Sequence, residues 1–144
     1  MSMKNLTDIK IEGTRYDEGA LPETTVQMVF GEYHFKEGTY YLTYGEKLAD
    51  GEKESKAVLK TDGKTASLIR FSKFGASMNF NPLKPHIGKY STPHGVLDFE
   101  IVTHEVALKI KDKKADLLLR YRMKIAGQQS ENKLKINFNL REGN

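Results

Sequence analysis

The chain has 144 residues, enough for a single domain over residues 1–144 with a buried core, but short for two domains. Charged residues make up 29% and hydrophobic residues 38%, which is ordinary for a soluble globular protein. The absence of cysteine excludes disulfide bonds, thiolate metal sites and a cysteine nucleophile.

The net charge of +4 is unevenly distributed along the chain. Residues 105–142 hold ten Lys or Arg against five Asp or Glu, a net charge of +5, and the rest of the chain is close to neutral. The N-terminus lacks the apolar segment of a signal peptide, and no run approaches the roughly 20 apolar residues that span a bilayer. We therefore expect a cytosolic protein without membrane contacts.

Alternation of apolar and polar residues with period two dominates the chain. It is clear in Thr25–Phe30, Leu117–Ile125 and Lys133–Leu140, and no segment has a helical stripe. Residues that tolerate positive φ separate the alternating runs, as tight hairpins require. These turn sites are Glu37-Gly38, Asp50-Gly51, Asp62-Gly63, Pro93-His94-Gly95, Asp112-Lys113 and Gly127-Gln128. The pattern predicts eight to ten antiparallel strands, connected mostly in sequence order.

Two hairpins allow a register to be predicted. A two-residue loop at Asp62-Gly63 pairs Leu59 with Ala66 and Ala57 with Leu68, which gives one apolar face. A loop at Gly127-Gln128 gives the last hairpin a consistent core face too. Its predicted pairs are Tyr121 with Leu134, Leu119 with Ile136 and Leu117 with Phe138.

The long strand after Gly95 changes the face that carries its apolar residues. Leu97, Phe99 and Ile101 share one parity, whereas Val106, Leu108 and Ile110 share the other. A β-bulge or sharp bend within residues 102–105 is therefore expected. A meander of this length must pack as two sheets or close into a barrel, and closure removes the exposed edges that invite aggregation.

Four motifs, which appear in order and cover most of the chain, resemble a known family. They are Gly38-Thr-Tyr-Tyr-Leu-Thr-Tyr44, Leu68-Ile-Arg-Phe71, Thr92-Pro-His-Gly95 and Ser130-Glu-Asn-Lys-Leu-Lys-Ile136. The family is the YwiB-like proteins of Gram-positive bacteria, calycin-type barrel proteins of unknown function. The resemblance implies an all-β, antiparallel up-and-down, lipocalin-like barrel in the bacterial cytosol, and transfers no catalytic residues. True lipocalins carry an N-terminal Gly-Xaa-Trp signature, and this chain has no tryptophan, so secreted transport of lipophilic molecules is not inherited.

Histidine is the residue type that most invites a metal or catalytic interpretation. His94 occupies a predicted turn and His104 the irregular segment, a strand's length apart. The spacing from His86 to His94 to His104 matches no established zinc pattern. We interpret these histidines as structural or exposed and predict no metal site and no cofactor.

Arg70 is the most informative charged residue, because the predicted register places it on the apolar face, opposite Ser55. An inward guanidinium keeps its charge and needs acceptors, so Arg70 is a candidate anchor for an anionic ligand. The competing interpretation is that Arg70 turns outward or pairs internally with a carboxylate such as Glu32. Tyr40, Tyr44, Tyr121 and Asn132 are the expected neighbours. The predicted ligand-lining residues are Arg70, Tyr40, Leu42, Tyr44, Leu68, Met78, Phe80, Phe99, Tyr121 and Met123.

The last strands present a basic outer face. The predicted register sets Arg122 opposite Lys133 and Arg120 opposite Lys135, with Asp116 and Glu131 neutralising Lys109 and Lys124. Such a face suits nucleic acid or an acidic protein partner, or is a solvated face that discourages association of sheets. Its members are Lys109, Lys111, Arg120, Arg122, Lys124, Lys133 and Lys135.

No nucleophile elbow, phosphate-binding loop or dinucleotide fingerprint is present, so catalysis is the less favoured interpretation. The sequence favours a barrel that binds a small, partly apolar and possibly anionic molecule in its interior. The alternative is a solid barrel whose basic outer sheet is an interaction surface. Either form is expected as a monomer or a homodimer, since an unclosed edge strand can pair across a two-fold axis.

Overall fold

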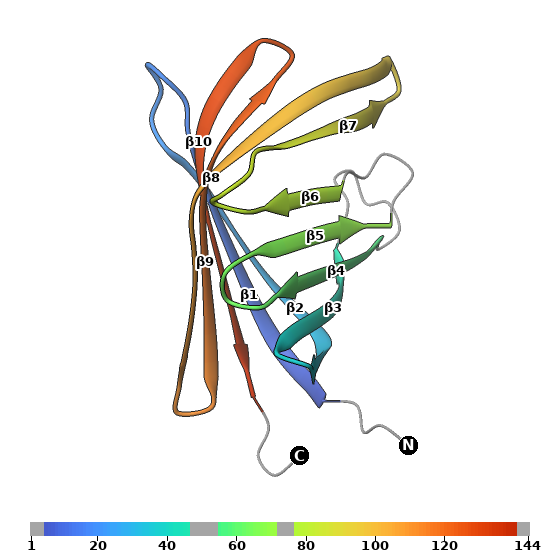
Figure 1. Cartoon of the computed structure of the whole chain (residues 1–144), viewed down its shortest axis with the longest axis vertical. Helices are drawn as coiled ribbons and strands as arrows, with labels where there is room; N and C mark the ends of the chain where they lie inside the picture. Colours follow the sequence, from blue (N-terminus) through green and yellow to red (C-terminus); the bar gives the residue numbers. More distant parts are fainter. Residues whose placement is uncertain (1–4, 47–54, 72–76, 141–144) are drawn as a thin grey trace.

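The computed structural model describes residues 5–46, 55–71 and 77–140, which form ten antiparallel strands (Figure 1). Within those ranges there is no helix, so the all-β prediction is confirmed. The strands are β1 (Asn5–Tyr16), β2 (Glu23–Lys36), β3 (Thr39–Glu46), β4 (Ser55–Thr61), β5 (Ala66–Arg70), β6 (Ser77–Phe80), β7 (His86–Thr92), β8 (Gly95–Lys111), β9 (Lys114–Ile125) and β10 (Gln128–Asn139).

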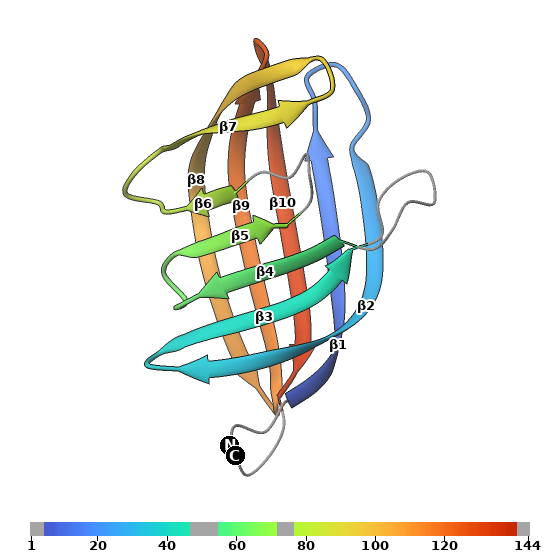
Figure 2. The same cartoon turned by 90° about the vertical axis from the view of Figure 1, so that its right-hand side faces the viewer.

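All ten strands belong to one sheet in the order β6-β5-β4-β3-β2-β1-β10-β9-β8-β7. Each strand pairs with its sequence neighbour, and β1 pairs with β10, placing Ile9 opposite Phe138. The sheet curls so that β3 to β6 cross over β8, β9, β10 and β1 (Figure 2). This arrangement is the expected up-and-down barrel, which is nearly closed and has a seam between its two edge strands, β6 and β7.

His86 bridges that seam. Its Nε2 lies 3.2 Å from the carbonyl oxygen of Ser77, and its Nδ1 lies 3.4 Å from the amide nitrogen of Asn79, both on β6. The imidazole ring also packs against Phe99, with ring centroids 5.7 Å apart. One side chain therefore supplies part of the contact that a backbone ladder would make in a fully closed barrel.

The predicted irregularity in the long strand is confirmed. The register of β8 against β9 shifts between Thr103 and Glu105, so His104 is the extra residue of a β-bulge. Before the bulge Phe99 and Ile101 are buried, and after it the parity changes to Val106 and Leu108, which pack against the core.

The predicted pairing at Asp62-Gly63 is wrong by two residues. The loop comprises residues 62–65, so Leu59 pairs with Leu68, not with Ala66, and Ala57 pairs with Arg70, not with Leu68. The longer loop is stabilised by the Asp62 side chain, which accepts two backbone N–H groups within it at 2.8 Å. A shift of two leaves the inward face unchanged.

The predicted register of the last hairpin is also wrong by two residues. Its turn is Ala126-Gly127, both with positive φ, instead of Gly127-Gln128, because a two-residue turn of this type needs two left-handed residues. The inner residues Tyr121, Leu119, Leu117 and Ala115 therefore face a set of partners displaced by two. These partners are Asn132, Leu134, Ile136 and Phe138 respectively.

Three of the remaining predicted turns are confirmed, and the fourth cannot be compared with the structure. Glu37-Gly38 and Asp112-Lys113 form turns with positive φ, and Pro93-His94 joins β7 to β8. Asp50-Gly51 lies outside the described residues.

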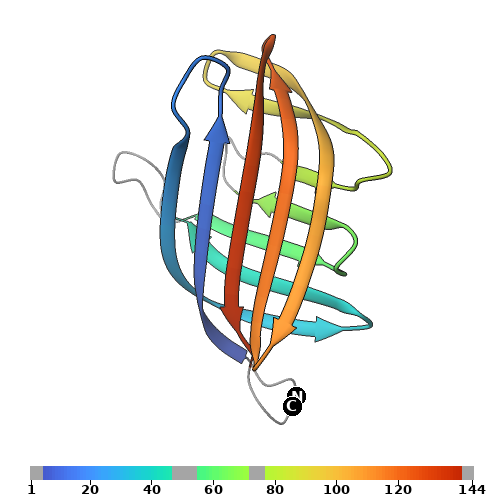
Figure 3. The same cartoon turned by 90° about the vertical axis from the view of Figure 1, so that its left-hand side faces the viewer.

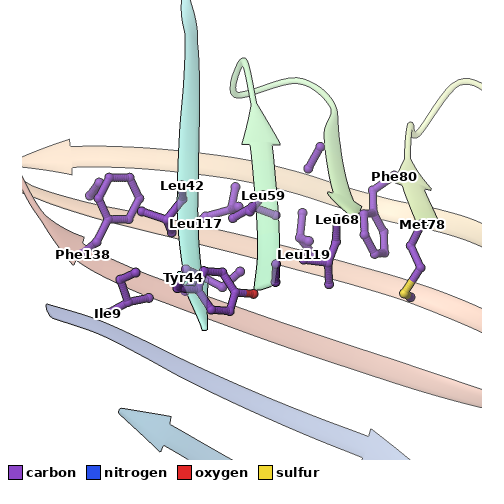
Figure 4. Close-up of a cluster of buried hydrophobic side chains, with 14 of the residues drawn as sticks. Ile9, Leu42, Tyr44, Leu59, Leu68, Met78, Phe80, Leu117, Leu119 and Phe138 are labelled. Atoms are coloured by element: carbon purple, nitrogen blue, oxygen red, sulfur yellow. The ribbon is translucent and has the colours of Figure 1, made fainter. Parts of the chain in front are cut away.

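A packed hydrophobic core lies inside the barrel, and Figure 4 shows part of it. Inward residues of all strands contribute to it, and the largest that are less than 2% exposed are Phe80, Ile9, Leu42, Leu59, Ile101, Leu117, Leu119 and Ile136. Gly31 allows β2 to approach β3 there, because a Cβ on residue 31 would lie 2.2 Å from the carbonyl oxygen of Thr43.

Candidate ligand-binding site

The core does not extend along the whole barrel. On β10 the inward positions pass from buried Phe138 and Ile136 to partly exposed Leu134 and Asn132, and β1 changes in the same direction from Ile9 onward. Beyond the core lies a cavity of about 290 Å³, here called the upper cavity. Its lining residues are Gly13, Thr14, Arg15, Glu23, Thr25, Tyr121, Asn132, Lys133 and Leu134.

Six inward polar residues lie where the core ends, and we call them the lumenal polar cluster. They are Tyr44, Glu46, Ser55, Arg70, Thr103 and Tyr121. Glu46 lies opposite Ser55 on β4, and Tyr44 and Arg70 both lie opposite Ala57. On the facing wall Thr103 lies opposite Tyr121.

Arg70 continues the inward parity of Ala66 and Leu68 at the end of β5, but it is an exposed residue, and it is paired with a carboxylate that we did not predict. Its Nε lies 3.1 Å from Glu46 Oε2 and 3.4 Å from Oε1. The Glu46 side chain is only 12% exposed and that of Arg70 is 40% exposed. The internal partner is therefore Glu46, not Glu32, and it lies 24 residues away in the chain.

The charge of Arg70 influences two tyrosines, Tyr44 on β3 and Tyr121 on β9. Burial raises the pKa of Tyr44, helped by the nearby Glu46 carboxylate and opposed by the Arg70 guanidinium. Burial also raises the pKa of Tyr121, and the Arg70 charge again opposes the shift. Both phenols therefore stay protonated at neutral pH and can donate a hydrogen bond within reach of the same guanidinium.

Two hydroxyls of the cluster are buried without a partner. Among the described residues, the side-chain oxygens Ser55 Oγ and Thr103 Oγ1 have no hydrogen-bond partner, although these two residues are only 8% and 6% exposed. Leaving a buried hydroxyl unsatisfied costs about 1–3 kcal/mol, so native proteins seldom do so without reason. Ser55 and Thr103 both occupy inward positions of the lumenal polar cluster.

A second depression adjoins the cluster from the outside. It has a volume of about 380 Å³ and lies where the pairing of β2 with β3 ends, at Gly31 and Tyr44. We call it the fork groove. Its lining residues are Leu6, Phe30, Gly31, Glu32, Thr43, Tyr44, Gly45, Ser55 and Lys56. Tyr44 and Ser55 of the cluster border the fork groove, and Tyr121 borders the upper cavity.

The ten predicted ligand-lining residues lie in different surroundings in the structure. Leu42, Leu68, Met78, Phe80 and Phe99 are buried members of the packed core. Tyr40 is partly buried against the core, and its ring packs against those of Phe35 and Phe138. Arg70, Tyr44 and Tyr121 belong to the lumenal polar cluster, and Met123 is partly buried.

Sequence reasoning missed two members of the cluster, Glu46 and Thr103, and placed Ser55 on the inward face without assigning it to the site. The signal was present for Glu46, which continues the inward parity of Leu42 and Tyr44.

The described histidines lie apart from one another. His104 Nε2 contacts Glu131 Oε2 at 2.9 Å on the outer surface, whereas His86 bridges the seam and His94 lies in a turn. Within the described ranges no three His, Asp or Glu residues converge as metal ligands would.

The outer face of β8, β9 and β10 (Figure 3) carries the predicted basic residues, but its charges are arranged differently from the prediction. Arg122 lies opposite Glu131 and not Lys133, and its Nε donates to Glu131 Oε1 at 2.8 Å. Arg120 lies opposite Lys133 and not Lys135. The cause is the displaced turn of the last hairpin, which moves every partner by two residues.

One of the two opposite-charge pairs expected on this face is found in the structure. Lys109 lies opposite Asp116 as predicted, but Lys124 lies opposite Glu100 of β8 and not opposite Glu131. Partial burial acts to raise the pKa of Glu131, and hydrogen bonds from Arg122 and His104 outweigh this and lower it. Acidic side chains therefore interrupt the basic face.

No helix in the described part of the chain is both long and apolar enough to cross a membrane.

Comparisons with known proteins agree with this architecture. The crystal structure of the ywiB protein from Bacillus subtilis superposes with a TM-score of 0.83 at 19% identity, covering 98% of this chain and 95% of that one. At this identity the likeness shows the fold. A Bacteroides ovatus protein of unknown function reaches a TM-score of only 0.38, with 10% identity, 96% of this chain and 41% of that chain covered.

No curated protein matches the sequence significantly. Residues 9–136 match a family described as Domain of unknown function (DUF1934), a span that includes nearly every described strand. The resemblance to YwiB-like proteins is thereby confirmed, and the chain belongs to the DUF1934 family.

Proposed function

We propose that this protein binds a small, partly apolar molecule inside the barrel, at the lumenal polar cluster, and that it acts without catalysis. One observation carries the proposal: a cavity of about 290 Å³ meets the cluster at Tyr121, and the cluster holds two buried, unpartnered hydroxyls. A ligand would satisfy the hydroxyls and cover apolar surface such as Leu134. The cytosolic location expected from the sequence stays a prediction.

The ligand should be sought in protein isolated from the cells that encode it. Native mass spectrometry is expected to show a mass above that of the 16.4 kDa chain, which disappears on denaturation. Solvent extraction of the same sample then identifies the small molecule. A homogeneous, ligand-free protein that binds nothing from a metabolite extract would refute the proposal.

Position 13 offers a variant that should close the upper cavity without unfolding the barrel. A Cβ on Gly13 would meet Thr25 and Leu134 at 3.6 and 3.7 Å, which are ordinary contacts, so Gly13→Leu projects its side chain into the cavity. Lys10→Leu on the same strand is the control, because Lys10 is exposed, lies opposite Met28 and Asn137, and is not among the residues that line the upper cavity. Retention of the ligand should be lost in the first variant and kept in the second.

A second candidate function uses the outer basic face and a polyanion such as nucleic acid or an acidic protein segment. It is favoured by Arg120 and Lys133, like charges directly opposite one another, which repel by some tenths of a kcal/mol unless an anion lies between them. Glu105, 3.2 Å from Arg120 Nε, already offsets part of that repulsion. Titration with oligonucleotides and polyglutamate at low salt tests it, since no binding there would end this candidate.

A further inference from the structure

We infer that the lumenal polar cluster recognises an uncharged head group with hydrogen-bond acceptors and donors, of which a carboxamide is the simplest example. This inference rests on the proposed function and deepens it by naming the class of ligand. It differs from the expectation of an anionic ligand, which depended on an Arg70 guanidinium without a carboxylate partner.

The first step concerns charge. Arg70 and Glu46 form an ion pair at inward positions, with Nε 3.1 Å from Oε2, so the cluster has no net charge. The carboxylate is the more enclosed partner, at 12% exposure against 40% for the guanidinium. A ligand anion entering beside Arg70 would meet Glu46 at close range in a partly desolvated place, where repulsion is weakly screened. An uncharged head group avoids this cost.

The second step counts the hydrogen-bonding groups that remain. Only Nε of Arg70 is bonded within the described residues, which leaves the four N–H bonds of its two terminal nitrogens as donors. The phenols of Tyr44 and Tyr121 add two further donors, since burial keeps them protonated. Glu46 retains lone pairs that its one partner does not use. The cluster therefore offers donors for a carbonyl oxygen and an acceptor for an N–H group.

The third step concerns the unpartnered hydroxyls. Ser55 adjoins Glu46 on the neighbouring strand, and Thr103 adjoins Tyr121 on the opposite wall. A hydroxyl can both donate and accept, so each can adapt to a neutral polar ligand. Two adaptable groups on opposite walls suit a molecule with several polar atoms around an apolar body.

The test compares two probes of nearly identical shape, phenylacetamide and phenylacetate. Each is titrated at pH 7 into isotope-labelled protein, and amide shifts on β3, β5 and β9 report binding at the cluster. In the wild type the carboxamide is expected to bind about fivefold more tightly than the carboxylate, because only the latter faces Glu46 with a like charge.

Glu46→Gln supplies the decisive comparison. It keeps the size of the side chain and removes its charge, so Arg70 gains a net attraction for anions. The preference is expected to move by about tenfold or more toward phenylacetate. Asp98→Asn is the matched control, because it neutralises the acid of an exposed pair with Lys89, 2.9 Å apart on the outer surface, and should leave the preference unchanged.

The outcomes separate the inference from the proposed function. If phenylacetate binds the wild type more tightly, or Glu46→Gln leaves the preference unchanged, the inference is overturned while interior binding stands. If neither probe shifts the cluster and native mass spectrometry finds no ligand, the proposed function fails and the inference fails with it. Thermal unfolding of each variant shows that the comparison is made on folded protein.

Discussion

Replacing Thr103 by valine should stabilise the ligand-free protein. Valine has the shape and β-branching of threonine, so the strand and its packing are kept while the unpartnered hydroxyl is removed. The residue is only 6% exposed, and a buried hydroxyl without a partner costs about 1–3 kcal/mol. We expect a gain of about 1 kcal/mol, or about 3–5 °C in Tm for a domain of this size.

Thr61→Val is the matched control. Thr61 is also buried, at 3% exposure, but its hydroxyl donates to the carbonyl oxygen of Thr65 at 2.8 Å and accepts the N–H of Gly63 at 3.1 Å. The same chemical change there removes two hydrogen bonds and should destabilise the protein by about 1–2 kcal/mol. The two variants therefore differ in the sign of their effect.

The assay is urea unfolding of ligand-free, refolded protein, followed by circular dichroism and tyrosine fluorescence. Equal slopes against urea show that the two variants unfold as the wild type does. If Thr103→Val destabilises as much as Thr61→Val, the Thr103 hydroxyl is satisfied, for instance by a buried water, and the reasoning from unpartnered groups is wrong.

Three further predictions concern the barrel itself. Leu119→Ala should cost about 2–5 kcal/mol of unfolding free energy, because Leu119 is fully buried in the packed core; a urea midpoint near that of the wild type would contradict this. Gly31→Ala should prevent a native fold, visible as lost dispersion in a proton NMR spectrum, since its Cβ would lie 2.2 Å from the carbonyl oxygen of Thr43. Hydrogen bonds from the Thr65 and neighbouring backbone N–H groups lower the pKa of Asp62, so its charge stabilises the fold above the unfolded pKa near 3.8 and this contribution is lost as the pH falls through the folded value. The stability deficit of Asp62→Ala against wild type should therefore be smaller at pH 3 than at pH 7, and an equal deficit would refute the assignment.

The inward and outward faces of the strands could be predicted from the sequence because alternation is a local property. Phe99 and Ile101 before the bulge and Val106 and Leu108 after it reveal the change of face without any knowledge of their partners. Registers could not be fixed in this way. A register that is wrong by two residues, as at Asp62-Gly63, leaves the same side chains facing inward. It differs from the correct register only in the geometry of the turn.

The candidate site shows the same division. The inward parity of Arg70 could be predicted from its own strand alone. Its ion pair with Glu46 could not be predicted, because Glu46 lies 24 residues away in the chain. Of the two interpretations of Arg70, an anchor for an anionic ligand or a partner of an internal carboxylate, the structure shows the pairing, with Glu46 in place of Glu32.

The sequence by itself determined the strands, the bulge and the inward residues, since each follows from the period of two along a single segment. Only the tertiary structure decided where the core ends and which polar groups meet there. Arg70 on β5 influences Tyr121 on β9 because the curled sheet brings these two strands to face each other. No pattern within a single segment of the sequence predicts that approach. Closure of the barrel is what converts six scattered polar residues into one cluster.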